Sequence, residues 1–308
     1  MQESIKMYDI IVIGCGVAGM TAALYARRNG MTVLVIEADT IGGQISKSPK
    51  VENFPTIPSI EGMELADKLF EQITEKGAEF ELDTVKEIVK DGKEFTVKTE
   101  YSEFKSKAVI IASGVKHREL GLENEEKFIG NGISYCALCD GAFYEGQEVC
   151  LIGDANTALQ YALLLSNTSS KVRIFTLFDK FFADKALVDA IKSRDNVTYV
   201  HNHKLIELKG GDELEAIVFE KEDGSIEEVA CKGLFVAIGQ VPDNQKFANL
   251  VELDKVGYIV ADESCTTKTE GLFVAGDCRT KSVRQLSTAV GDGAVASTAA
   301  CNYINKNF

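Results

Sequence analysis

Continuous apolar runs that end in glycine recur along the chain. Residues 9–14 read Asp-Ile-Ile-Val-Ile-Gly without polar alternation, which predicts a strand buried on both faces of a parallel sheet. We expect a helix over 22–28, ended by Asn29-Gly30, and a second strand over 32–37 that ends in an acid. Together these elements predict a complete βαβ unit.

A second βαβ unit follows later in the chain. An apolar strand over 148–153, a helix over 158–165 and a strand over 172–175 repeat the order of the first unit. Residues 109–114 and 234–239 also resemble each other, since both are apolar runs with a terminal glycine. We therefore predict an α/β protein with two Rossmann-like dinucleotide-binding-type domains.

Two stretches alternate apolar and polar residues instead. Residues 80–105 do so around the turn signal Asp91-Gly92, and residues 205–232 do so around Asp223-Gly224. This alternation predicts small antiparallel sheets. Added to each βαβ unit, such a sheet gives a three-layer ββα arrangement.

Length and composition limit the function classes. A chain of 308 residues has room for about two domains. Its 33 basic and 47 acidic residues give a formal charge of −14, so we expect no nucleic acid or membrane partner. No apolar run approaches the roughly 20 residues of a membrane helix. Most of the eight cysteines, such as Cys15 and Cys150, are isolated in apolar surroundings, which predicts thiols in a reducing compartment and a cytoplasmic protein.

A glycine motif lies between the first predicted strand and helix. In such a motif one glycine makes a tight turn, one lets the backbone approach a pyrophosphate, and one allows close packing of helix on strand. An acid at the end of the next strand accepts hydrogen bonds from ribose hydroxyls. The sequence therefore predicts an adenine dinucleotide site at Gly14, Gly16, Gly19 and Glu37.

Cys136 and Cys139 are the one closely spaced pair of cysteines. A two-residue spacer lets the sulfurs close to a disulfide or open to a dithiol with little backbone change, and it lowers the pKa of one thiol. Half of a zinc site and an inert buried pair are the alternatives. Structural zinc needs four ligands, and no second cysteine pair is present, while His201 and His203 flank a single asparagine. We therefore expect no metal.

Several separated motifs follow one another along the chain: Gly42-Gly43-Gln44, Val51-Glu52-Asn53-Phe54-Pro55, Ala112-Ser113-Gly114, and Gly276-Asp277 followed by Arg284-Gln285 and Ala289. With these motifs in this order and context, the chain resembles the low-molecular-weight thioredoxin reductase family of flavoproteins over nearly its whole length. The resemblance implies FAD as cofactor. In that family the aspartate at the position of Asp277 holds the ribityl chain, and the helix after it points its N-terminus at the flavin ring. Beyond the three glycines of the motif and Glu37, the residues that the resemblance assigns to FAD are Gly42, Gly43, Gln44, Asn53, Ala112, Gly114, Gly276, Asp277, Arg284, Gln285 and Ala289.

The same resemblance implies a role for each residue of the segment Cys136-Ala-Leu-Cys139-Asp140. Reduced flavin attacks the disulfide at Cys139, Cys136 then attacks the disulfide of a thioredoxin, and Asp140 carries protons. The alternative for Asp140 is a plain turn residue. The resemblance further implies a homodimer and an FAD domain made of residues 1–114 and 244–308. A central redox domain over 115–243 is expected to resemble a degenerate NADPH-binding domain.

The second glycine motif departs from the family pattern. Ala155 replaces the glycine that lets pyrophosphate approach, while Gly153 and Ala158 still suit the turn and the packing. The arginines and histidine that hold the 2′-phosphate of NADPH are also missing, and such a phosphate needs Arg or Lys. The matching positions hold Thr176, Leu177, Phe178 and Phe182.

This combination resembles the ferredoxin-dependent flavin thioredoxin reductases, which implies reduced ferredoxin as electron donor. Ferredoxins are usually acidic, so an acidic chain needs a local basic patch to bind one. Two other functions stay open: a reductase that takes electrons from NADPH, NADH or another flavoprotein, and a flavin-binding redox sensor without turnover. The candidate patch, with scattered solubilising charges as its alternative, consists of Lys47, Lys50, Arg279, Lys281 and Arg284.

Overall fold

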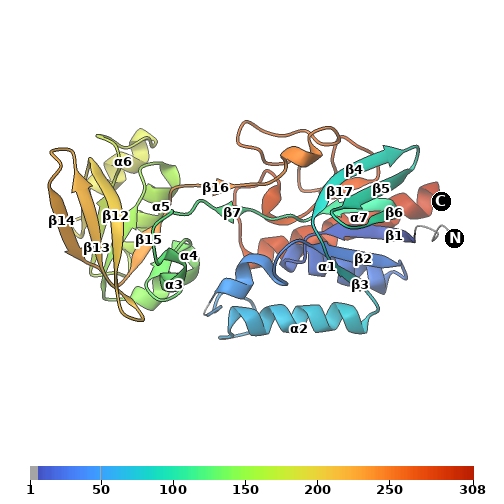
Figure 1. Ribbon diagram of the computed structural model, residues 1–308, viewed down its shortest axis with the longest axis horizontal. Coiled ribbons are helices and arrows are strands. Elements are labelled where there is room, and N and C mark those ends of the chain that lie inside the picture. The colour runs from blue at the N-terminus through green and yellow to red at the C-terminus, as the bar shows by residue number, and fades with distance from the viewer. Residues whose placement is uncertain (1–5, 49) are drawn as a thin grey trace. The chain divides into compact units, whose positions relative to one another are not determined.

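The computed structural model describes residues 6–48 and 50–308. It divides into two compact units, one made of the residues up to Lys116 and from Val241 onward, the other of His117–Gln240. The chain passes between them at β7 (Lys116–His117) and β16 (Gln240–Val241), which pair with each other (Figure 1). These crossings lie within a few residues of the domain boundaries expected from the sequence.

The first unit is built on a sheet whose centre is parallel. β1 (Met7–Ile13) pairs in parallel with β2 (Val33–Glu37) on one side and with β6 (Glu103–Ile111) on the other. Between β1 and β2 runs α1 (Val17–Arg28), which begins five residues before the predicted start because the glycine motif itself enters the helix. The strand order is β3-β2-β1-β6-β5-β4, with β17 (Leu272–Val274) also beside β6.

The predicted antiparallel stretch is part of this same sheet, so a separate small sheet over residues 80–105 is wrong. β3 (Glu79–Leu82) pairs in parallel with β2, while β4 (Val85–Asp91) and β5 (Glu94–Thr99) form an antiparallel hairpin. The nine-residue strand β6 joins the two parts, because residues 103–106 pair with β5 and residues 105–111 pair with β1.

Alternate side chains of β1 enter two different cores. Ile10 and Val12 pack in a cluster with α1 and α7 (Leu286–Asn307), whereas Ile11 and Ile13 pack with Phe247 on the opposite face. Both faces of the sheet are therefore covered, as the continuous apolar run predicts. The unit also contains α2 (Gly62–Glu75) and the 3-10 helices η1 (Gly43–Lys47), η3 (Gln245–Phe247) and η4 (Gly276–Cys278).

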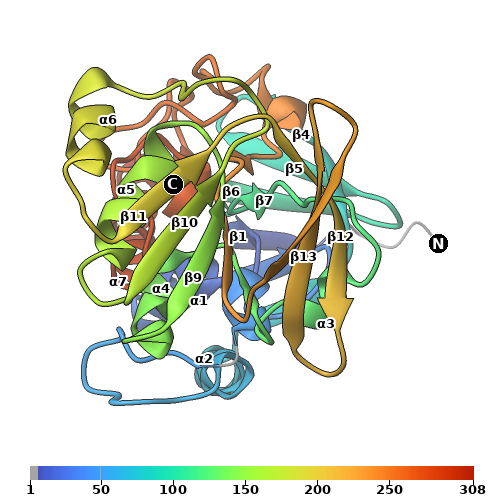
Figure 2. The same ribbon diagram turned by 90° about the vertical axis from the view of Figure 1, so that its left-hand side faces the viewer.

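The second unit has the predicted three layers. Its parallel sheet has the order β11-β10-β9-β15-β8, and its antiparallel sheet has the order β12-β13-β14. In Figure 2 the helices α5 and α6 lie on one side of the parallel sheet, with β12 and β13 on the other. Val149 and Leu151 of β9 pack against α5, while Cys150 between them packs against the antiparallel sheet.

None of the helices in the described part of the chain is long and apolar enough to cross a membrane.

The bounds of the elements in the second unit follow the predicted segments closely. The strands are β8 (Ile133–Ser134), β9 (Glu148–Ile152), β10 (Lys171–Phe175), β11 (Val197–Val200), β12 (His203–Gly210), β13 (Leu214–Lys221), β14 (Ile226–Ala230) and β15 (Leu234–Val236). The helices are α3 (Glu125–Phe128), α4 (Ala137–Asp140), η2 (Gly141–Tyr144), α5 (Asn156–Leu165) and α6 (Lys185–Lys192).

Candidate active site

The three glycines of the first motif differ in what surrounds them. Gly14 has φ +107°, and a Cβ there would lie 2.3 Å from the carbonyl oxygen of Ala112. A Cβ on Gly19 would lie 1.9 Å from the carbonyl oxygen of Gly14, so these two glycines are needed for the turn and for helix packing. A Cβ on Gly16 would meet no atom closer than 3.9 Å, so protein packing leaves the backbone open there, as a phosphate group requires.

A second glycine turn, distant in sequence, lies beside the first. Gly42 forms an isolated parallel bridge with Gly16, and its N–H donates to the carbonyl oxygen of Cys15 at 2.9 Å. A Cβ on Gly43 would lie 3.7 Å from the Cα of Gly16. The next side chain, Gln44, donates from Nε2 to the carbonyl oxygen of Val115 at 2.5 Å. The fold thus brings two predicted cofactor segments together.

The carboxylate of Glu37 is fixed by backbone groups. Its Oε2 accepts the N–H of Cys15 at 2.6 Å, and its Oε1 accepts those of Ala38 at 2.8 Å and Asp39 at 3.0 Å. A carboxylate oxygen has two acceptor positions, so Oε2 keeps one for a further donor such as a ribose hydroxyl. The carboxylate is therefore held in place before any ligand binds.

Asp277 carries a buried oxygen without a partner. Among the residues that the structure describes, none hydrogen-bonds to its Oδ1, although that atom is buried. Burial raises the pKa of this carboxyl, and the nearby Lys281 and Arg284 oppose that shift. Buried acceptors in proteins are nearly always satisfied, so the orphaned oxygen indicates a missing donor. A ribityl hydroxyl is such a donor, and together with the open backbone at Gly16 this oxygen shows that the residues fit FAD.

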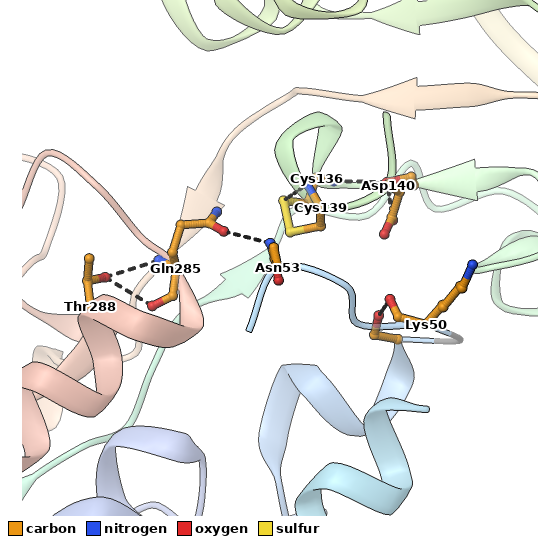
Figure 3. The surroundings of a disulfide bond; sticks show 9 residues. Lys50, Asn53, Cys136, Cys139, Asp140, Gln285 and Thr288 are labelled. Carbon is orange, nitrogen blue, oxygen red and sulfur yellow. Dashed lines mark hydrogen bonds between the residues drawn. A yellow bond between two sulfur atoms is a disulfide. The ribbon is translucent and has the colours of Figure 1, made fainter. Parts of the chain in front are cut away.

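The start of α7 holds the remaining predicted cofactor residues. Gln285 caps the helix, and its side chain accepts a hydrogen bond from Asn53 Nδ2 at 3.1 Å (Figure 3). Thr288 Oγ1 accepts the N–H of Gln285 at 3.2 Å, which completes a capping box. Ala289 is buried in the next turn. Arg284 lies over the ring of Tyr258 at 4.1 Å from its centroid.

The proposed basic patch is wrong for two of its five members. Arg279 is 2% exposed and the Lys281 side chain 5% exposed, and both pair with Asp292 of α7. Lys47 and Lys50 are exposed, and Lys50 pairs with Glu52 at 2.6 Å. Asp292 is not among the residues predicted from the sequence, where its one distinguishing feature is that it is the single acid in α7.

Cys136 and Cys139 form a disulfide, with their Cα atoms 5.3 Å apart (Figure 3). Cys136 caps the short helix α4, and the backbone N–H of Cys139 points at Cys136 Sγ at 3.2 Å. The turn between the two predicted redox cysteines therefore brings their sulfur atoms together. Across the described ranges, no cluster of three or more His, Cys, Asp or Glu side chains could hold a metal ion.

Asp140 carries a partly buried carboxyl. Its Oδ2 accepts a hydrogen bond from Ser134 Oγ at 2.6 Å, while its Oδ1 is buried and has no partner within the described part of the chain. Burial raises the pKa of the carboxyl, as expected for a proton carrier, and the Ser134 bond offsets part of that shift. Ser134 Oγ also accepts the N–H of Cys136 at 3.1 Å, a connection that the sequence analysis missed.

The second glycine motif is bound to a neighbouring segment of the chain. Gly153 keeps its role in the fold, since a Cβ there would lie 2.5 Å from the carbonyl oxygen of Ala237. Ala155 caps α5 and forms a bridge with Phe182, whose N–H donates to the carbonyl oxygen of Asp154 at 2.7 Å. The turn is preserved, but a methyl group stands where the open glycine of the first motif stands.

The segment 176–182 presents apolar side chains where a nucleotide phosphate would need cations. Thr176 is buried, and its Oγ1 donates to the carbonyl oxygen of Phe178 at 2.7 Å. Leu177, Phe178 and Phe182 are each at least half exposed, whereas Phe181 packs edge-on against Tyr199 and His201. Phe181 therefore packs against the core of the unit, whereas Phe178 and Phe182 contact each other edge-on at its surface.

Comparisons with known proteins show which family the chain resembles. A family profile described as pyridine nucleotide-disulphide oxidoreductase matches residues 8–293. The chain is 40% identical to a thioredoxin reductase of Listeria monocytogenes, covering 99% of this chain and 97% of the relative, and 38% identical to that of Bacillus subtilis, covering 98% and 96%. The crystal structure of thioredoxin reductase from Streptococcus pyogenes superposes with a TM-score of 0.95 at 36% identity, covering 98% of this chain and all of that one.

The chain therefore belongs to the low-molecular-weight thioredoxin reductase family of disulphide oxidoreductases, whose members are FAD-binding flavoproteins. The two Rossmann-like domains predicted from the sequence are confirmed. The Cys136–Cys139 disulfide is the redox-active pair of this family pattern.

Proposed function

We propose that this protein reduces the disulfide of a thioredoxin through FAD and the Cys136–Cys139 pair, with reduced ferredoxin as its electron donor. One observation carries the choice of donor. Segment 176–182, at the end of a dinucleotide-type strand, presents Leu177, Phe178 and Phe182 to solvent where a 2′-phosphate would need Arg or Lys.

The acceptor half of the reaction uses the two cysteines in different roles. In the reduced pair, the N–H of Cys139 would stabilise a thiolate on Cys136, because it already points at that sulfur at 3.2 Å. The Cys136 thiolate attacks the partner's disulfide and forms a mixed disulfide, releasing one partner thiolate. The Cys139 thiolate then attacks Cys136 Sγ, restores the Cys136–Cys139 disulfide and releases the second partner thiolate.

Asp140 supports the exchange by moving protons. Burial raises the pKa of its carboxyl, so it binds a proton more readily than an exposed aspartate. Its unpartnered Oδ1 is free to exchange that proton with a cysteine sulfur or a leaving thiolate, while Ser134 holds Oδ2. The proton released when a thiol ionises thus has a local acceptor.

The FAD half rests on the residues that fit the cofactor. Bound FAD accepts electrons one at a time and delivers them in pairs to a disulfide. Gly16 would let the backbone approach its pyrophosphate, while Gly14 and Gly19 make the turn and the helix packing around it, and Glu37 would accept ribose hydroxyls. Asp277 would accept a hydroxyl through Oδ1, while Asn53 and Gln285 hold each other at the start of α7.

Ferredoxin suits this combination energetically. A ferredoxin near −400 mV and a thioredoxin near −270 mV differ by about 130 mV, or roughly 6 kcal/mol for two electrons. The reaction would therefore run strongly toward reduced thioredoxin. The expected setting is the cytoplasm, because six of the eight cysteines are free thiols, and the expected assembly is a homodimer.

A second candidate keeps a nicotinamide donor. The turn at Gly153 and its packing on Ala158 are preserved, and the matching family is named for pyridine nucleotides, so an atypical NADPH or NADH site is the alternative. A flavin-binding sensor without turnover is the non-enzymatic alternative.

The proposal is tested by measuring the formation of thioredoxin thiols under anaerobic conditions with each electron donor. We expect thiols to form with reduced ferredoxin and not with NADPH or NADH. Replacing Cys136→Ser should lower this rate by roughly 10³-fold or more, since the nucleophile is lost, while FAD stays bound. Cys301→Ser is the control, because it removes a free thiol that the reaction does not use. Thiol formation at wild-type rates in Cys136→Ser would refute the exchange mechanism, and absence of turnover with every donor would favour the sensor.

A further inference from the structure

Three charged side chains are buried together in the first unit. Arg279 donates from Nε and Nη2 to the two oxygens of Asp292 at 2.9 and 2.8 Å, and Lys281 Nζ donates to Asp292 Oδ2 at 2.8 Å. The three side chains are exposed by 2%, 5% and 7% for Arg279, Lys281 and Asp292. We call these three residues the charge cluster.

The charge cluster contains two cations and one anion. Burial favours the neutral form of Asp292, but the hydrogen bonds from Arg279 and Lys281 outweigh it and lower the pKa of the carboxyl. Glu263, at 3.4 Å from Arg279, and Asp262 are further acids near that guanidinium, but the Glu263 side chain is 94% exposed and Asp262 is exposed too, so water largely screens both. Counted alone, the charge cluster therefore carries one excess positive charge, and the nearby Asp277 and Arg284 add one charge of each sign.

Asp292 also holds the turn that carries Asp277. Its Oδ2 accepts the backbone N–H of Gly276 at 2.9 Å, and Gly276 begins the 3-10 helix η4. Asp277 is the next residue, and its orphaned Oδ1 is the atom assigned to the cofactor. Lys281 is close enough to Asp277 to lower the pKa of that carboxyl against the effect of burial. A hydrogen bond from Gly276 to Asp292 thus connects the charge cluster to the turn that carries Asp277.

We infer that Asp292 is a positioning residue for the cofactor turn at Gly276-Asp277, and that the excess positive charge of the charge cluster makes the bound flavin easier to reduce. The inference rests on the proposed FAD site. Reduction adds negative charge to the cofactor, so nearby uncompensated positive charge favours the reduced form. The charge cluster would thus adjust the reduction potential of the flavin without contacting it.

Two substitutions should move the potential in opposite directions. Asp292→Asn keeps an acceptor for the Gly276 N–H but removes the negative charge, so the flavin potential should become more positive. Lys281→Met removes one cation, so the potential should become more negative. We expect each change to alter the equilibrium constant for two-electron reduction by about tenfold, or about 30 mV. Asp243→Asn is the matched control, because Asp243 is 72% exposed and lies in the same unit.

The reduction potentials of the flavin are measured by equilibration with a reference dye under anaerobic conditions. FAD affinity is measured from the fluorescence of flavin released from the protein. Shifts of both variants in the same direction, or shifts no larger than that of Asp243→Asn, would overturn the inference. If Asp292→Asn does not fold, the negative shift in Lys281→Met still decides the question. A wild-type protein that binds no FAD would refute the proposed function itself, whereas FAD binding with unchanged potentials would refute the charge cluster alone.

Discussion

Ser134 Oγ donates to Asp140 Oδ2 at 2.6 Å and accepts the backbone N–H of Cys136 at 3.1 Å. This serine therefore connects the proposed proton carrier to the redox pair. Its hydrogen bond stabilises the carboxylate and lowers the pKa of Asp140, while burial raises it.

Ser134→Ala should raise the pKa of Asp140 further, because the favourable hydrogen bond is lost and the burial remains. The limb of the pH profile of kcat/KM that reports Asp140 should move to higher pH. Ser134→Thr, which keeps a hydroxyl, is the control. A profile that stays in place in Ser134→Ala would mean that Asp140 does not titrate in the rate-determining step.

Asp140→Asn should lower activity without lowering stability at neutral pH. The pKa of Asp140 is raised above its ordinary 3.8 in the folded protein, so the folded state binds the proton more tightly than the unfolded chain. The carboxyl therefore costs stability as pH rises from 3.8 through the raised folded pKa, and that cost is complete above it. Urea unfolding at several pH values should show this slope in the wild type and its loss in Asp140→Asn. A large fall in the unfolding free energy of the variant at pH 7 would contradict the argument.

The strands at the centre of both units could be predicted from the sequence. The runs over 9–14 and 148–153 lack polar alternation, and they are β1 and β9, each of which pairs in parallel with both of its neighbours. The alternating stretch 80–105 was harder, because alternation predicts a strand with one exposed face but does not say which strand lies beside it. β6 pairs with β5 over one half and with β1 over the other, and no local pattern encodes that.

Buried charges were the main failure at the candidate site. The candidate basic patch combines Arg279 and Lys281 with exposed lysines, although both side chains are buried, which is unusual for charged residues. Their common partner, Asp292, lies beyond a turn and on a helix, so sequence spacing does not show the contact. The role of Ser134 is likewise not visible in the sequence, because its hydrogen bond to Asp140 depends on the fold.

Asp277→Ala should weaken FAD binding by about 10- to 100-fold, because a hydrogen bond to a charged group contributes roughly 1.5–3 kcal/mol. The buried Oδ1 has no other acceptor role in the described structure, so its loss should affect the cofactor more than the fold. Equilibrium dialysis of the apoprotein with FAD measures the effect, with Asp243→Ala as an exposed control from the same unit. Equal affinities in the two variants would remove Asp277 from the FAD site.

The combination of Leu177→Arg, Phe178→Arg and Ala155→Gly should create NADPH dependence. Leu177 and Phe178 are half exposed, so arginines can reach solvent there. Water reduces each charge-assisted bond to a 2′-phosphate to about 1 kcal/mol, so the two together should improve NADPH use by about 10- to 100-fold. NADH lacks this phosphate and is the matched control in kinetics of flavin reduction. An equal gain with both nucleotides would show that the arginines do not contact the phosphate.

An anaerobic titration of the flavoprotein, followed by flavin absorbance, distinguishes ferredoxin from a nicotinamide nucleotide as the electron donor. NADPH, NADH and reduced ferredoxin are added in turn, and oxidised thioredoxin is present in a parallel series. The account predicts that ferredoxin alone bleaches the flavin and that thioredoxin then restores its absorbance as thioredoxin thiols form. Rapid bleaching by NADPH would contradict it and would mean that Ala155 and the segment 176–182 still permit a nicotinamide donor.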